Sequence, residues 1–259
     1  VKDSHDNWAD WIPFDDMPQL YNPQKGWVGT CNHKTVGMNY PYYYSSYLSP
    51  SYRYRRLKQL LGSPGNKSAD EHWQFQRDIM NLMAKKIAPV IARALITHDD
   101  TKQMGQILSQ WDYLDDIDKA APTIFQSIYR KFALLVFQDE LREDLARTML
   151  DKWSFWEERL EKMVLNGISP WFDNVNTKDI KETVDKLLHQ AALDVAENLG
   201  SRLGQDPTKW VWEKVHQLEF VSPIRREGFG KGLVGGGSHP FLGSGETLSC
   251  GMYDFNDPF

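Results

Sequence analysis

Three neighbouring side chains with reactive groups stand at Cys31, Asn32 and His33: a thiol, an amide and an imidazole. In a strand, side chains two positions apart share one face, so Cys31 and His33 would lie together and Asn32 would face the other way. A Cys–His dyad with this spacing is unusual. Asn32 is of more interest, because a neutral amide can donate a hydrogen bond to a developing oxyanion without titrating. Asn is also a common turn former, and the spacing leaves both interpretations open.

The other motifs argue against cofactor and metal chemistry. Gly230-x-Gly232-x-x-Gly235 matches the dinucleotide fingerprint, but it continues into further glycines instead of opening a helix. The sequence contains neither a P-loop ending nor a His-Glu-x-x-His zinc signature. A dense group of carboxylates lacks the alternation and the central Gly of a calcium loop, so we interpret it as a solvated turn. This group consists of Asp112, Asp115, Asp116 and Asp118. We expect no cofactor and no metal.

The first of three zones, residues 1–50, has to position these side chains. It is rich in Trp, Tyr, Pro and Asn and shows no helical period. The β-branched and aromatic segment 25–31 predicts one buried strand that ends at Asn32. A tyrosine cluster follows, which we interpret as a packed loop, with a binding rim as the alternative. The cluster consists of Tyr40, Tyr42, Tyr43, Tyr44, Tyr47, Tyr52 and Tyr54.

The second zone, residues 51–220, is predicted to be a block of helices. Ser68 and Glu71 form a capping box at the start of the first long pattern. Apolar residues then recur at spacings of three and four, which is typical of helices that bury one face in a core. The patterns span 75–95, 104–111, 124–136, 155–164 and 180–195, and the third continues into the charged stretch 139–147. Pro89 should kink the first of these helices without ending it.

Helix boundaries in this block are marked by residues typical of them. Gly167 should end one helix in the left-handed conformation. Thr177 should cap the next helix, which should end at Gly200. Asp206 followed by Pro207 should open the last one. The third zone, residues 221–259, is rich in glycine, and we expect mostly loop with one short strand at 247–250.

Composition excludes several classes of protein. Lys and Arg number 30 against 35 Asp and Glu, and the formal net charge of −5 gives no electrostatic support for a nucleic-acid partner. The longest apolar run, 132–137, is too short to span a membrane, so we expect no membrane partner. Cys31 and Cys250 are expected to be free thiols. The start at Val1, without Met or an apolar leader, is expected of a processed or truncated end.

A set of short motifs occurs in order from about Trp8 to Cys250. They are Trp11-Ile12-Pro13, Met17-Pro18, Asn22-Pro23-Gln24-Lys25-Gly26-Trp27-Val28, Cys31-Asn32-His33, Tyr40-Pro41, Tyr52-Arg53-Tyr54-Arg55-Arg56-Leu57, Gln76-x-Asp78, Leu108-x-x-Trp111-Asp112, Trp210-x-Trp212-x-x-x-His216 and Gly243-x-Gly245-x-Thr247-Leu248. Together they resemble the penicillin acylase family of N-terminal nucleophile hydrolases. The resemblance implies a mainly α chain, a helical insertion block flanked by short strands, within the family's αββα fold.

The resemblance also implies a mechanism and a site. In that family an N-terminal Ser, Thr or Cys attacks an amide carbonyl, with its own α-amine as the base. By this resemblance Asn32 is the oxyanion donor and Arg53 is its supporting residue. The nucleophile would lie upstream of this chain, which would be an internal segment of the β chain, inactive alone. His33 stands where many members have a second Asn, which is a departure from the family pattern.

The resemblance therefore favours a segment of an amidohydrolase that cleaves the linear amide of an N-acylated small molecule. The substrate would be of the β-lactam side chain or acyl-homoserine lactone type. Its partners would be the α chain and the rest of the β chain of its own precursor. Family members are usually periplasmic or secreted, and we expect the same here. The alternative is a non-catalytic helical binding or scaffold module whose tyrosines form an interaction surface.

Overall fold

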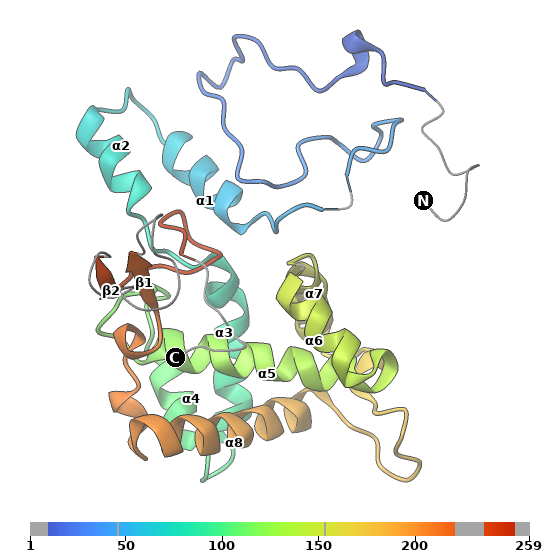
Figure 1. Cartoon of the computed structure of the whole chain (residues 1–259), viewed down its shortest axis with the longest axis vertical. Coiled ribbons are helices and arrows are strands. Elements are labelled where there is room, and N and C mark those ends of the chain that lie inside the picture. Colours follow the sequence, from blue (N-terminus) through green and yellow to red (C-terminus); the bar gives the residue numbers. More distant parts are fainter. Residues whose placement is uncertain (1–9, 46, 153, 221–235, 252–259) are drawn as a thin grey trace, which may run out of the picture.

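The computed structural model describes residues 10–45, 47–152, 154–220 and 236–251, and these residues are mainly helical (Figure 1). The helices are α1 (Tyr52–Leu61), α2 (Ala69–Gln76), α3 (Leu82–Ile96), α4 (Lys102–Ser109), α5 (Ala121–Leu141), α6 (Glu143–Lys152), α7 (Trp156–Asn166) and α8 (Val184–Leu203). Short 3₁₀ turns are η1 (Phe14–Asp16), η2 (Pro170–Phe172), η3 (Pro207–Lys209) and η4 (Trp212–Lys214). The strands β1 (Gln217–Phe220) and β2 (Gly237–Pro240) form an antiparallel pair. The expected mainly α class is confirmed. The motif Gly230-x-Gly232-x-x-Gly235 lies outside the described residues.

The core forms where α3, α4, α5 and α8 pack together, with α5 running through the middle (Figure 1). Ile124, Ile128 and Phe132 are fully buried on one face of α5, while Phe125 and Tyr129 are buried beside them. A helix that is apolar on most sides must be surrounded by others, which explains the central place of α5. None of the helices in the described parts of the chain is long and apolar enough for a membrane span.

Several predicted helix boundaries are confirmed. Ser68 Oγ accepts from the Glu71 amide at 3.1 Å while Glu71 Oε2 accepts from the Ser68 amide at 2.8 Å, which completes the capping box. Gly167 follows α7 with a φ of 72°. The Asp206 side chain accepts from the Thr208 amide, although only the short turns η3 and η4 follow it.

Other boundaries are wrong. The apolar pattern 75–95 is two helices, because the Asn81 side chain accepts from the Ala84 amide at 2.8 Å and starts α3 anew. α8 is capped by Thr183 instead of Thr177 and continues past Gly200 to Leu203. The hydrophobic period is the same on both sides of such a break, so it does not reveal the break.

Neither predicted strand forms. Residues 25–31 and 247–250 contain no strand, and the latter segment contributes only an isolated bridge between Ser244 and Cys250. The observed strands are instead β1 and β2, which the sequence analysis did not predict. A strand exists only when a second strand pairs with it, and the described residues offer no such partner to 25–31.

The tyrosine cluster divides into packed and exposed members. Tyr40 Oη donates to the Asp16 carbonyl at 3.0 Å, and Tyr42 Oη donates to Asp16 Oδ2 at 2.7 Å. Tyr43 and Tyr47, however, are 71% and 69% exposed. The packed-loop interpretation is therefore right for part of the cluster only, and most of the irregular segment 10–51 lies away from the helical core (Figure 1).

Helix α1, which follows this segment, is held by three sets of contacts. Arg56 forms an ion pair with Asp78 in the turn before α3, while the buried Tyr52 belongs to the hydrophobic core. At its N-terminus the amide and the hydroxyl of Ser51 donate to Glu158 of α7, at 2.9 and 2.5 Å. The first turn of α1 is thus fixed against both α3 and α7.

The last described segment, 236–251, is tied to the preceding part of the chain by two hydrogen bonds at the backbone of Gly243. The Gly243 amide donates to the Asp115 carbonyl at 2.7 Å, and Trp212 Nε1 donates to the Gly243 carbonyl at 2.9 Å. Gly243 has a φ of 86°, and a Cβ there would lie 2.0 Å from the Ser249 carbonyl oxygen. Only glycine fits this turn, which brings the following residues next to α1 and α7.

Candidate functional site

Asn32 and Arg53, the two residues singled out from the sequence, lie in contact. Arg53 lies in the first turn of α1, and its Nη2 donates a hydrogen bond to Asn32 Oδ1 at 3.1 Å. Because a guanidinium can only donate, the amide oxygen must face Arg53 and the amide Nδ2 keeps both of its hydrogens available. Asn32 is exposed, so this donor is open to a ligand.

The backbone of Asn32 is turned into the left-handed region, with a φ of 62°. Asn tolerates this region better than most residues, which agrees with its interpretation as a turn former. The Asn32 carbonyl accepts from the Ser49 amide at 2.8 Å, so that the two ends of the loop 32–49 are joined. The turn conformation and an open amide donor occur together at this residue.

Cys31 and His33 do not form a catalytic dyad. His33 Nδ1 accepts from the backbone amide of Cys31 at 3.4 Å, and its ring stacks on Tyr54 with centroids 3.7 Å apart. Burial raises the pKa of the Cys31 thiol, and burial together with Arg53 lowers the pKa of His33. At neutral pH the thiol is protonated and the imidazole is neutral, which is the opposite of an activated Cys–His pair. Both cysteines are free, as expected.

A cavity of about 110 Å³ lies on the other side of Arg53 and contains two carboxyl groups, Glu157 of α7 and Glu246 of the last segment. Glu246 Oε2 accepts from Ser244 Oγ at 3.0 Å and from Gln126 Nε2 at 3.2 Å. Glu157 is buried, and its Oε2 has no hydrogen-bond partner among the described residues. Arg53 is therefore placed between an exposed amide and two enclosed carboxyls.

The pKa values of the two carboxyl groups are shifted in the same direction. Burial raises the pKa of Glu157 well above its usual range, and the neighbouring Glu246 adds to that rise. Burial also raises the pKa of Glu246, while the Ser244 and Gln126 hydrogen bonds oppose it. The Arg53 guanidinium favours the ionised form of both groups. The charge of Arg53 thus has a direct electrostatic link to each carboxyl.

Sequence reasoning missed both carboxyls. Glu157 follows Trp156 at the start of an apolar helical stripe. Its position as a charged residue beside that stripe was the signal in the sequence that could have identified it. Glu246 stands inside the motif Gly243-x-Gly245-x-Thr247, in the glycine-rich zone that is expected to be mostly loop. As for metals, no group of three or more His, Cys, Asp or Glu side chains suited to hold an ion occurs within the described ranges.

Comparisons with known proteins show what the chain is similar to. A family model described as Penicillin amidase matches residues 1–258. The acyl-homoserine lactone acylase QuiP of Pseudomonas aeruginosa is 24% identical over 291 residues, which cover 96% of this chain and 33% of that protein. QuiP of Pseudomonas putida is 25% identical over 83% of this chain and 29% of its own length. The penicillin acylase 2 proenzyme of Pseudomonas sp. (strain SE83) is 25% identical over 50% of this chain and 17% of its own length. The chain spans about a third of the length of the curated relatives that it matches.

Proposed function

Because the chain belongs to the penicillin amidase family, we propose that it forms part of an amidohydrolase that cleaves the linear amide of an N-acylated small molecule. The names of the relatives, acyl-homoserine lactone acylase and penicillin acylase, support an amide bond as the target. They also support the substrate type, an acyl-homoserine lactone or a β-lactam antibiotic with an acyl side chain.

In the proposed mechanism Asn32 stabilises the tetrahedral intermediate. Its Nδ2 donates to the oxyanion that forms when a nucleophile adds to the amide carbonyl. Arg53 is a positioning residue, because its bond to Oδ1 orients Nδ2 away from α1. The Arg53 Nη2 to Asn32 Oδ1 contact is the observation that supports this assignment most directly, since a free Asn side chain would sample several rotamers.

The nucleophile in this proposal is an N-terminal Ser, Thr or Cys of another segment of the precursor. Its own α-amine, with a pKa near 8, accepts the hydroxyl or thiol proton near neutral pH. This chain is then a segment of an αββα N-terminal nucleophile fold and is inactive alone. The enzyme would be periplasmic or secreted, as the family resemblance suggests.

Exposed apolar side chains in the first zone support further precursor segments as partners. Trp11, Tyr21 and Met38 are 91%, 96% and 93% exposed. Exposed apolar groups gathered in one segment are typical of a surface that another polypeptide covers. The α chain and the rest of the β chain are the proposed occupants of this surface.

Substitution of Asn32 in the full-length enzyme tests the proposal. Asn32→Asp has nearly the same size and retains an acceptor for Arg53, but it has no N–H to donate. We expect kcat to fall by about 10²- to 10³-fold, the usual effect of removing one oxyanion donor. Asn39→Ala, at an exposed position in the same loop, is the matched control and should leave kcat unchanged. Unchanged turnover by Asn32→Asp would remove the assignment and favour the helical binding or scaffold module instead.

A further inference from the structure

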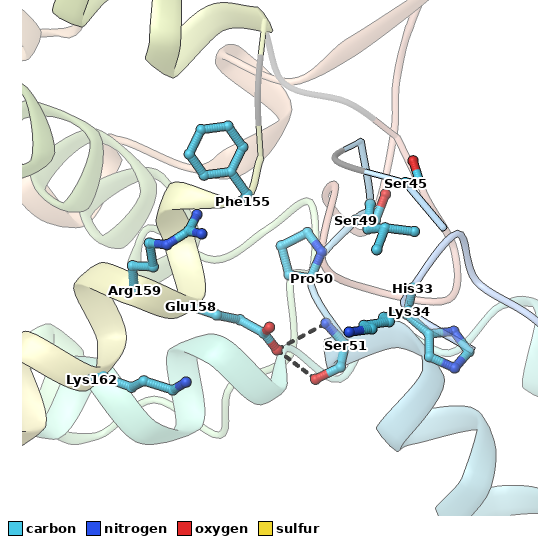
Figure 2. Close-up of a pocket in the computed structure, with 11 residues that line it drawn as sticks. His33, Lys34, Ser45, Ser49, Pro50, Ser51, Phe155, Glu158, Arg159 and Lys162 are labelled. Atoms are coloured by element: carbon cyan, nitrogen blue, oxygen red, sulfur yellow. Dashed lines mark hydrogen bonds between the residues drawn. The ribbon is translucent and has the colours of Figure 1, made fainter. Parts of the chain in front are cut away.

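A second and larger cavity, of about 540 Å³, lies between the loop that follows Asn32 and the first turns of α7. Lys34 borders it from the loop, while Arg159 and Lys162 border it from α7 (Figure 2). It shares only Ser49 and Pro50 with the small cavity beside Arg53. The two cavities are therefore neighbours that share the 49–50 segment.

The charged groups of this larger cavity are mostly positive. Lys34, Arg159 and Lys162 form no ion pair with another described residue. Glu158 is the single acid among the described lining residues, and its Oε1 already accepts from the amide and hydroxyl of Ser51 (Figure 2). His33 adds no charge at neutral pH, because burial lowers its pKa. The cavity thus has three positive charges and one partnered negative charge, in a chain whose net charge is −5.

The cavity also has apolar walls and the size of a small-molecule site. Phe155, Pro50 and Leu48 line it beside the basic groups. The Arg159 guanidinium lies over the Phe155 ring, with Cζ 4.7 Å from the ring centroid. A volume within the range of about 300–1,000 Å³ typical of ligand pockets is larger than a single inorganic ion needs. Basic groups beside an apolar wall suit a ligand with one anionic end and one apolar end.

We infer that this cavity binds a small carboxylate with an apolar body. The basic groups of the lining, Lys34 from the loop and Arg159 and Lys162 from α7, attract the carboxylate, and the body packs on Phe155, Pro50 and Leu48. The lysines act as point charges, and the attraction is strengthened because the cavity walls exclude part of the solvent.

The connection to catalysis rests on the proposed function. Hydrolysis of an N-acyl amide releases a carboxylic acid with an apolar acyl body, which is the ligand class that the cavity fits. Lys34 follows Asn32 by two positions, so the cavity adjoins the proposed oxyanion donor.

Calorimetric titration of the full-length protein with hexanoate tests the inference. Hexanamide, which has the same body without the charge, and acetate, which has the charge without the body, are the matched probes. Hexanoate should bind at least about tenfold more tightly than either, because hexanamide lacks the charge-assisted contact and acetate lacks the apolar body. Equal binding of hexanoate and hexanamide, or no binding of hexanoate, would overturn the inference.

Substitutions of exposed lysines locate the site without threatening the fold. Lys34→Gln and Lys162→Gln should each weaken hexanoate binding by about tenfold, and Lys162→Arg should retain it. Lys102→Gln, at an exposed position on α4 outside the lining, is the control and should change nothing. Unaltered binding in both lysine variants would place the carboxylate elsewhere and refute the site. These titrations do not depend on turnover, so failure of the Asn32→Asp experiment and failure of this one are separate results.

Discussion

Arg56 Nε and Nη2 donate to the two carboxylate oxygens of Asp78, at 2.9 and 2.6 Å. This two-point contact fixes the rotation of α1 about its axis, because both partners are planar and meet edge to edge. Arg53 lies on the preceding turn of the same helix. The pair therefore determines, from a distance, where the guanidinium of Arg53 points.

Loss of the two-point geometry should cost stability. Arg56→Lys keeps the charge but not the planar fork, and we expect a loss of about 1–2 kcal/mol in the free energy of unfolding. Both side chains are only partly exposed, so solvent screens the pair incompletely. Urea denaturation of the chain measures the change. Lys58→Gln, on the exposed side of α1, should have no effect, and an equal loss there would contradict the argument.

Removal of the Arg53 guanidinium should reduce turnover in the full-length enzyme. Without Arg53 the Asn32 amide loses its orienting partner, and we expect Arg53→Ala to lower kcat by about 10- to 100-fold. Because Arg53 orients the donor instead of donating to the oxyanion, KM should change much less than kcat. A variant with normal kcat and altered KM would show that Arg53 contacts substrate instead.

Gly243 should not tolerate any side chain. At a φ of 86° and with the Ser249 carbonyl 2.0 Å from the position of a Cβ, Gly243→Ala forces the turn to open. We expect the variant to be about 1–3 kcal/mol less stable, measured by thermal or urea unfolding. Gly245→Ala, two positions further, has no atom within 4 Å of its Cβ and is the control. Similar losses of stability in both variants would contradict this argument. They would show that the backbone freedom of glycine matters more than the contact with the Ser249 carbonyl oxygen.

Stability should depend on the ionisation of Asp115. Burial raises the pKa of this carboxyl from its ordinary value of 3.8 to about 7, with the nearby Glu246 acting in the same direction. Between these two pH values the folded chain holds a proton that the unfolded chain has released. The free energy of unfolding should therefore fall as the pH rises from about 4 to 7.

Asp115→Asn isolates this contribution. The amide oxygen of Asn can still accept from Asn81 Nδ2, which donates to Asp115 Oδ2 at 3.0 Å in the chain. Burial lowers the pKa of His216 to about 4, so His216 makes the free energy of unfolding rise with pH instead of fall. The variant must therefore be compared with the parent at each pH. Urea unfolding from pH 4.5 to 7.5 should show a gain of the variant over the parent that grows with pH. A difference in the free energy of unfolding between variant and parent that does not change with pH would refute the raised pKa of Asp115.

Local features of the helical block were predictable because they depend on neighbours in the sequence. The reciprocal capping box of Ser68 and Glu71 spans four residues, and the left-handed Gly167 needs only the absence of a Cβ. Thr177 was a reasonable cap by the same local rule. Thr183 caps α8 instead, and the choice between the two threonines is not made by residues within a few positions.

The mainly α class and the stripes that form the core follow from the sequence alone, and the family resemblance adds Asn32 and Arg53 as a candidate pair. Helix packing is what brings these two side chains into contact, places Glu157 and Glu246 in a cavity beside Arg53, and sets Lys34 across a second cavity from α7. Periodicity and capping act over one or two helical turns. Contacts between residues 21 to more than 100 positions apart depend instead on how whole helices pack, and no local pattern records that packing.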